Sequence, residues 1–141
     1  GHVGAWAPRA EQVATAELLK NAGEIERYSK WLHDGLQARL DALHAGFTAM
    51  KAEGLPVRAI APQGAIYLSV RFDLIGKKGI QTNDQIRKLL LDEAGFAVVP
   101  FQAFGLEGEN GWFRLSVGAV SLKDIEQALP RVKAALQKAL A

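Results

Sequence analysis

Residues 24–53, EIERYSKWLHDGLQARLDALHAGFTAMKAE, carry the strongest periodic pattern of the chain. Apolar side chains recur in this segment at every third or fourth position, namely Tyr28, Leu32, Leu36, Leu40, Leu43, Phe47 and Met50. Such spacing puts one apolar side chain per turn on a single face, which predicts an amphipathic helix. The helix would be roughly 45 Å long at 1.5 Å per residue. That length is large for one small domain and suggests an element that joins two bodies.

Four segments after this helix predict short strands, at residues 57–60, 65–72, 96–99 and 112–117. The clearest is 65–72, AIYLSVRF, in which Ile66, Leu68, Val70 and Phe72 alternate with Tyr67, Ser69 and Arg71. Alternation of this kind is typical of a strand with one buried face. The run 96–99, FAVV, is apolar throughout, which is typical of a strand buried on both faces.

Further helices are predicted before, between and after these strands. Pro8 suits the first turn of a short helix that ends near Lys20. Thr82 with Gln85 forms a capping box for a helix that stops at Gly95. Ser121 with Asp124 forms another, for a last helix over 121–140, in which Pro130 predicts a kink or a restart.

Together these elements predict an α+β fold. A small, mainly antiparallel sheet is covered by helices on one face and is preceded by the long helix, of the kind found between domains. We predict a single domain over residues 1–141, in which residues 1–23 form an N-terminal arm and a short helix. The chain does not begin with Met, which agrees with the expectation that it is part of a longer polypeptide.

Composition excludes several classes of function. The 141 residues are 49% hydrophobic and 23% charged, as in ordinary globular domains. The net charge of +2 is scattered, which argues against a nucleic-acid or anionic membrane surface. No segment is apolar enough to cross a membrane. Cysteine is absent, which excludes disulfides and thiol chemistry and favours a cytoplasmic protein. The three histidines stand apart, so we expect no metal site.

Arg114 is the first candidate for a binding residue, because it lies within the apolar strand segment 112–117. A guanidinium group there must reach either solvent or an anion, since an unpaired buried charge is very costly. Its planar fork suits a carboxylate held by two hydrogen bonds. Strand alternation alone also explains an arginine that simply faces solvent, and the pattern leaves both interpretations open.

Two loops are further candidates. Residues 100–105, PFQAFG, place two aromatic rings after a predicted strand, where ligand sites are common. Taken alone, however, this loop is better explained as a hydrophobic plug over the core. Residues 62–65, PQGA, have small side chains that would allow a ligand to approach the backbone, or they form a plain turn.

Three segments, taken in order, resemble one family. PQGAIYL at 62–68, LLLDEAGFAVVPFQAFG at 89–105 and WFRLSVG at 112–118 look like the C-terminal part of class I/II aminotransferases. These are the fold-type I enzymes that depend on pyridoxal 5'-phosphate (PLP). The last predicted helix, 121–140, matches the family's final element. The opening segment 2–19 is similar to the part that follows the cofactor lysine in one subgroup.

The resemblance implies a role for three residues. Arg114 would hold the α-carboxylate of the substrate, an amino acid or a 2-oxo acid, while Tyr67 and Phe104 would line the substrate side of the cleft. Phe101 stands where the family usually has glycine, which is expected to narrow the pocket. The segment Gly4–Trp6 would approach the cofactor phosphate of a neighbouring subunit, since these enzymes are typically homodimers.

The resemblance also implies that this chain is incomplete as an enzyme. The lysine that binds PLP, and the other residues that hold the cofactor, precede residue 1 in the family, on a large domain of the same polypeptide. We therefore expect no catalytic residue in this chain and no transamination by it alone. Trp6, Tyr28 and Trp31 would be exposed where the rest of the enzyme is absent. The alternative is a free-standing, non-enzymatic α+β module for binding or regulation.

Overall fold

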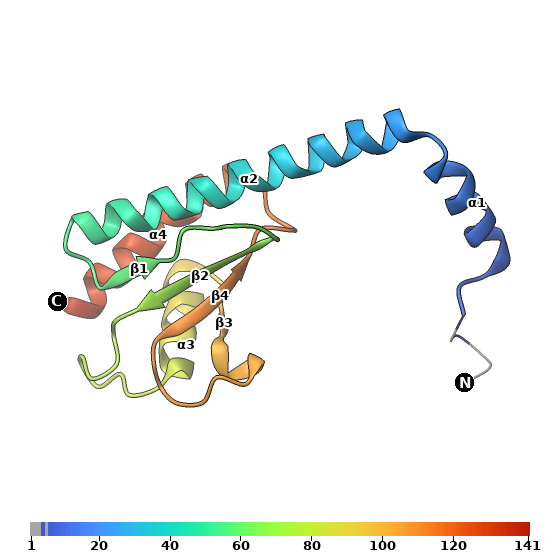
Figure 1. Cartoon of the computed structure of the whole chain (residues 1–141). Coiled ribbons are helices and arrows are strands. Elements are labelled where there is room, and N and C mark those ends of the chain that lie inside the picture. The colour runs from blue at the N-terminus through green and yellow to red at the C-terminus, as the bar shows by residue number, and fades with distance from the viewer. Residues whose placement is uncertain (1–3, 5) are drawn as a thin grey trace. The chain divides into compact units, whose positions relative to one another are not determined.

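The computed structural model describes residue 4 and residues 6–141 of the chain (Figure 1). The elements are, in order, α1 (Arg9–Leu19), α2 (Ala22–Ala52), β1 (Val57–Ala59), β2 (Tyr67–Phe72), α3 (Asn83–Ala94), β3 (Val99–Pro100), the 3-10 helix η1 (Phe101–Phe104), β4 (Trp112–Ser116) and α4 (Leu122–Leu140). The described residues fall into two compact units that divide between Gly35 and Leu36. We call them the N-terminal unit and the C-terminal unit.

The four strands form one sheet in the C-terminal unit, in the order β1-β2-β4-β3. Each neighbouring pair is antiparallel. On β4, Arg114 lies opposite Ser69 of β2 on one side and opposite Val99 of β3 on the other. The prediction of an α+β fold with a small antiparallel sheet is therefore confirmed.

The two faces of the sheet differ in burial. Along β2, Leu68, Val70 and Phe72 are buried, whereas Tyr67, Ser69 and Arg71 between them are not. The buried face packs against the C-terminal part of α2, α3 and α4 (Figure 1). The helices contribute to this core through Leu40, Leu43, Phe47, Met50, Ile86, Leu90, Ala94, Ile125, Val132, Ala135 and Leu136. The other face, which we call the open face, carries the polar side chains of β2 and β4.

Helix α3 has the start and the end that the sequence predicts. The Thr82 hydroxyl accepts a hydrogen bond from the backbone N–H of Gln85, and the Gln85 side chain accepts one in return from the N–H of Thr82. The helix ends at Gly95, which has a φ of 61°. This left-handed conformation is easy for glycine because it has no Cβ.

Helix α4 runs without interruption through Pro130, so the predicted restart is wrong. A proline inside a helix removes one backbone hydrogen bond and crowds the preceding turn. Buried side chains lie on both sides of it, including Ile125 before and Val132 and Leu136 after. Their burial in one core holds both halves of the helix in the same direction.

The predicted strand 96–99 is wrong in extent and in burial. Strand β3 contains only Val99 and Pro100, and Val99 is 44% exposed. β3 lies at the edge of the sheet, and Pro100 has no N–H with which to continue the ladder. Phe96 instead turns its ring toward Phe47, with the ring centroids 6.3 Å apart.

The other strands are slightly shorter than predicted. β2 begins at Tyr67 rather than residue 65, because Ala65 has a φ of 57° and belongs to a turn. This result agrees with the interpretation of residues 62–65 as a plain turn. β1 and β4 each end one residue earlier than expected.

The apolar stripe of the long helix is buried only from Leu40 onward. The first part of α2 belongs to the N-terminal unit together with α1, which has no buried residue. Trp6, Tyr28 and Trp31, which the sequence singles out as exposed aromatic residues, are 79%, 59% and 68% exposed. Ala5, part of the segment expected near the cofactor phosphate, lies outside the described residues.

Candidate carboxylate-binding site

Arg114 lies on the open face of the sheet between two aromatic rings. Its guanidinium carbon Cζ is 3.4 Å from the ring centroid of Phe104 and 4.1 Å from that of Tyr67. The three side chains come from β4, η1 and β2, so segments up to 47 positions apart meet at one place. The structure thus brings together the three residues that the resemblance assigns to substrate binding.

The ion pairs on the open face do not include Arg114 within the part of the chain that the structure describes. Arg58 and Arg71, on the same face, both lie near Asp73, with N–O distances of 3.7 and 2.6 Å. No carboxylate among residues 6–141 forms such a pair with Arg114. Aromatic rings cover the flat face of a guanidinium group, while its N–H donors point outward in the plane. This arrangement can hold an external carboxylate through two hydrogen bonds.

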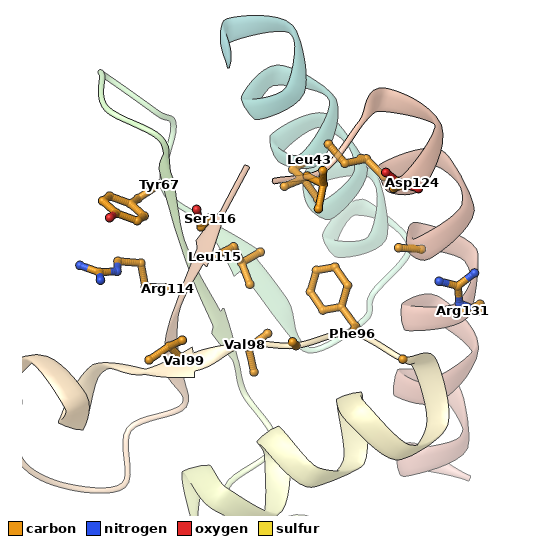
Figure 2. A pocket seen from close by; sticks show the side chains of 15 residues that line it. Leu43, Tyr67, Phe96, Val98, Val99, Arg114, Leu115, Ser116, Asp124 and Arg131 are labelled. Carbon is orange, nitrogen blue, oxygen red and sulfur yellow. The ribbon is translucent and has the colours of Figure 1, made fainter. Parts of the chain in front are cut away.

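A cavity of about 480 Å³ adjoins this site. Figure 2 shows Tyr67 and Arg114 projecting to one side of the strands, and Leu43, Phe96 and Leu115 lying on the other. The β3–β4 ladder includes only Arg114 and Phe113 of β4, so the chain before Val99 separates from the strand. The cavity is lined mostly by apolar side chains.

The 3-10 helix η1 packs on the open face and not on the core. None of its residues is buried, and the ring of Phe101 meets those of Phe104 and Trp112 edge-on, at centroid distances of 6.1 and 6.5 Å. The loop is therefore not a plug over the core. Phe101 supports the ring that stacks on Arg114 and occupies space that glycine would leave empty.

Sequence reasoning missed residues that hold this site in place. Arg39 of α2 donates from Nη1 to the carbonyls of Val117 and Val120, at 3.0 and 2.9 Å. These bonds hold the loop that follows β4. Asn83 and Gln102 also form hydrogen bonds over long sequence separations. Their sequence context contains no signal for such bonds, because the partners become neighbours only in the fold.

Asp124 is the third residue of α4 and one of the residues that line the cavity. Its carboxylate accepts hydrogen bonds from the Ser121 hydroxyl, at 2.7 Å, and from the Ser121 backbone N–H, at 2.8 Å. These two bonds, the side-chain bond first, hold the pKa of Asp124 below its ordinary value of 3.8. Both bonds are stronger when the carboxylate is charged, because a charged acceptor binds N–H and O–H donors more tightly than a neutral one.

We expect Asp124→Asn to reduce the loss of stability in acid. The folded pKa of Asp124 lies below its unfolded value of 3.8, so its contribution is fully present above that pH and is lost as the pH falls through the folded pKa. Denaturant unfolding followed by circular dichroism between pH 6 and the acid limb of the curve would measure this effect. Glu126→Gln, which removes an exposed carboxylate from the same helix, is the control. Parallel pH curves for wild type and Asp124→Asn would contradict the assignment.

Comparison with known proteins agrees with this fold. The family model for aminotransferase class I and II matches residues 3–132. The aspartate aminotransferase of Rhizobium meliloti is 35% identical over 111 residues, which cover 74% of this chain and 25% of that protein. A probable aspartate/prephenate aminotransferase of Rickettsia felis is 41% identical over 80 residues, 52% of this chain and 19% of that protein.

Solved structures give the same result. The crystal structure of an aromatic aminotransferase from Pyrococcus horikoshii matches 90% of this chain with a TM-score of 0.72 and 28% identity, over 31% of its own chain. This chain belongs to the aminotransferase class I and II family. It spans between 19% and 31% of the length of these three relatives.

The residues that the structure describes do not fit PLP by themselves. No lysine among the described residues lines the cavity or stacks with Arg114. Lysines such as Lys88, Lys133 and Lys138 form ion pairs on the surface instead. Within residues 6–141, no group of three His, Asp or Glu side chains could hold a metal ion. The described helices include none with the length and apolar character to cross a membrane.

Proposed function

We propose that this chain is the C-terminal small domain of a PLP-dependent aminotransferase. The parent enzyme transfers an amino group between an amino acid and a 2-oxo acid, and Arg114 binds the α-carboxylate of both. The observation that carries the proposal is the guanidinium group of Arg114, stacked on Phe104 and Tyr67 without an ion-pair partner in the described chain. Membership of the aminotransferase family supports the reaction class.

The geometry supports a role in positioning the substrate. Arg114 is held by the strand β4 and by two rings, so few of its conformations remain open, and little entropy is lost when a carboxylate binds. Two parallel N–H···O bonds fix the direction of a carboxylate as well as its place. A substrate oriented in this way presents its amino group at a constant angle to the cofactor, and orientation of this kind accelerates the reaction.

The cofactor site, in this proposal, lies on the large domain of the same polypeptide. The small share of the relatives' length that the chain spans supports this division. The exposed rings of Tyr28 and Trp31, with centroids 5.7 Å apart, provide apolar surface for contact with the rest of a cytoplasmic homodimer. The isolated chain is expected to catalyse no transamination.

The native polypeptide provides the test. An antibody against this chain is used to measure its size in the source cell and to purify it for assays of PLP content and amino transfer. We expect a band much heavier than 15.2 kDa, with bound PLP and transaminase activity. A band at 15.2 kDa without activity would contradict the proposal and support a free-standing module. Transamination by the purified chain of 141 residues would contradict the assignment of the cofactor site to another domain.

A further inference from the structure

Asn83 is the one polar side chain that is buried among the described residues, with 1% of its surface exposed. It is the first residue of α3, next to the capping residue Thr82. A buried amide is costly unless both its carbonyl and its NH₂ group find partners. Asn83 satisfies both groups, and the two partners belong to different parts of the carboxylate-binding site.

The side-chain carbonyl group of Asn83 binds the residue that directly precedes β4. Its Oδ1 accepts a hydrogen bond from the backbone N–H of Gly111, at 2.8 Å. The Gly111 carbonyl in turn accepts from the N–H of Phe72, at 2.9 Å. Any side chain would be strained here, because a Cβ would clash with the Phe72 carbonyl oxygen and the φ is 75°. Arg114 follows three residues later, so this contact sets where its strand begins.

The side-chain NH₂ group of Asn83 forms a hydrogen bond with η1. Its Nδ2 donates to Oε1 of Gln102, at 2.7 Å. Gln102 lies within the turn, and its carbonyl accepts from the N–H of Gly105, at 3.1 Å. Phe104, between these two residues, carries the ring that stacks on Arg114. The same amide therefore holds both the strand of Arg114 and the turn of Phe104.

We propose that Asn83 is a positioning residue for carboxylate binding. By linking the start of β4 to η1, it sets the distance between Phe104 and Arg114 and thereby the direction of the guanidinium fork. The backbone N–H of Asn83 also donates to the Glu109 carboxylate, which ties the intervening loop to the same point. A purely apolar residue could fill the volume but could not connect the two segments. This inference rests on the proposed role of Arg114.

Gln102→Leu is the decisive variant, because it breaks only the bond to η1 and leaves the bond between Asn83 and Gly111 intact. Gln102 is partly exposed, so the fold is expected to tolerate the change. Gln102→Glu keeps an acceptor oxygen for Asn83 and should restore the wild-type behaviour. Gln127→Leu, at an exposed position of α4, is the matched control. Asn83→Leu removes both bonds and is expected to lower stability as well.

The first measurement is the NMR resonance of the Arg114 Nε–H group in the chain of 141 residues. This proton is shifted by the nearby aromatic rings, so the shift reports the stacking directly. We expect Gln102→Leu to move the resonance toward that of Phe104→Ala, while Gln102→Glu and Gln127→Leu leave it in place. An unchanged resonance in Gln102→Leu would overturn the inference.

The second measurement is steady-state kinetics of the full enzyme that contains the chain. We expect Gln102→Leu to raise KM for the amino acid about tenfold, with a smaller change in kcat, since a displaced binding group weakens orientation. If Gln102→Leu shifts the Arg114 resonance but leaves KM unchanged, the positioning role is contradicted. It is also contradicted if the variant changes KM but leaves the resonance in place. If neither Arg114→Leu nor Gln102→Leu changes KM, the proposed function is contradicted. If Arg114→Leu raises KM and Gln102→Leu does not, only the positioning role of Asn83 is contradicted.

Discussion

Arg114→Leu in the full enzyme is expected to lower kcat/KM for amino acid substrates by about 10²- to 10⁴-fold. The variant removes two charge-assisted hydrogen bonds to the carboxylate, each of which contributes about 1.5–3 kcal/mol. Leucine keeps an apolar side chain against Phe104 and Tyr67, so the fold of the strand is expected to remain. Arg114→Lys keeps the charge but loses the planar fork, and a smaller loss is expected.

The matched control for this prediction is Arg58→Leu. Arg58 is also on the open face and also contacts an aromatic ring, with its Cζ 5.7 Å from the ring centroid of Trp112, but it has Asp73 as an acidic neighbour. We expect little change in kcat/KM for this variant. An amine substrate without a carboxylate should react equally with wild type and Arg114→Leu. Carboxylate binding would not explain the effect if Arg114→Leu lowered kcat/KM equally for this amine and for amino acids. The same would follow if Arg58→Leu and Arg114→Leu lowered kcat/KM for amino acids equally.

Phe72→Ala is expected to lower the free energy of unfolding by about 3–5 kcal/mol. Phe72 has no exposed surface, and its ring lies edge-on to those of Phe47 and Phe113, with centroids 5.9 and 5.8 Å away. The three rings join α2, β2 and β4, so the cavity left by alanine would weaken contacts between all three. A domain of this size is stable by only about 5–15 kcal/mol. The variant should therefore be close to unfolding at 37 °C.

Denaturant unfolding of the chain, followed by circular dichroism, would measure this loss. Phe104→Ala is the control, because Phe104 is 43% exposed and lies outside the core cluster. Its replacement should cost less than about 1 kcal/mol, as is usual for surface substitutions. Equal losses in the two variants would contradict the assignment of the core to the helix-covered face of the sheet.

Local interactions explain why so much of the fold could be predicted. The capping boxes at Thr82 and Ser121 are complete within four residues of chain, and the structure contains both. The periodicity of residues 24–53 likewise reports a helix without reference to other segments. The predictions of secondary structure are wrong where contacts with segments distant in the sequence decide the conformation. Residues 96–98 have strand composition, yet they leave the ladder because β3 has a single neighbour at the edge of the sheet.

The candidate site, like the fold, could be predicted from the sequence only in part. Sequence patterns were enough to predict the helices, most of the strands, the alternation along β2 and β4, and the resemblance that singled out Arg114, Tyr67 and Phe104. The helices, the strands and the alternation depend on residues a few positions apart, and the resemblance depends on the order of three sequence segments. The tertiary structure alone decided that these three side chains stack together and that Arg114 has no acidic partner within the described chain. It also decided that Asn83 meets partners 19 and 28 positions away. Such contacts depend on how distant segments pack, which no local pattern records.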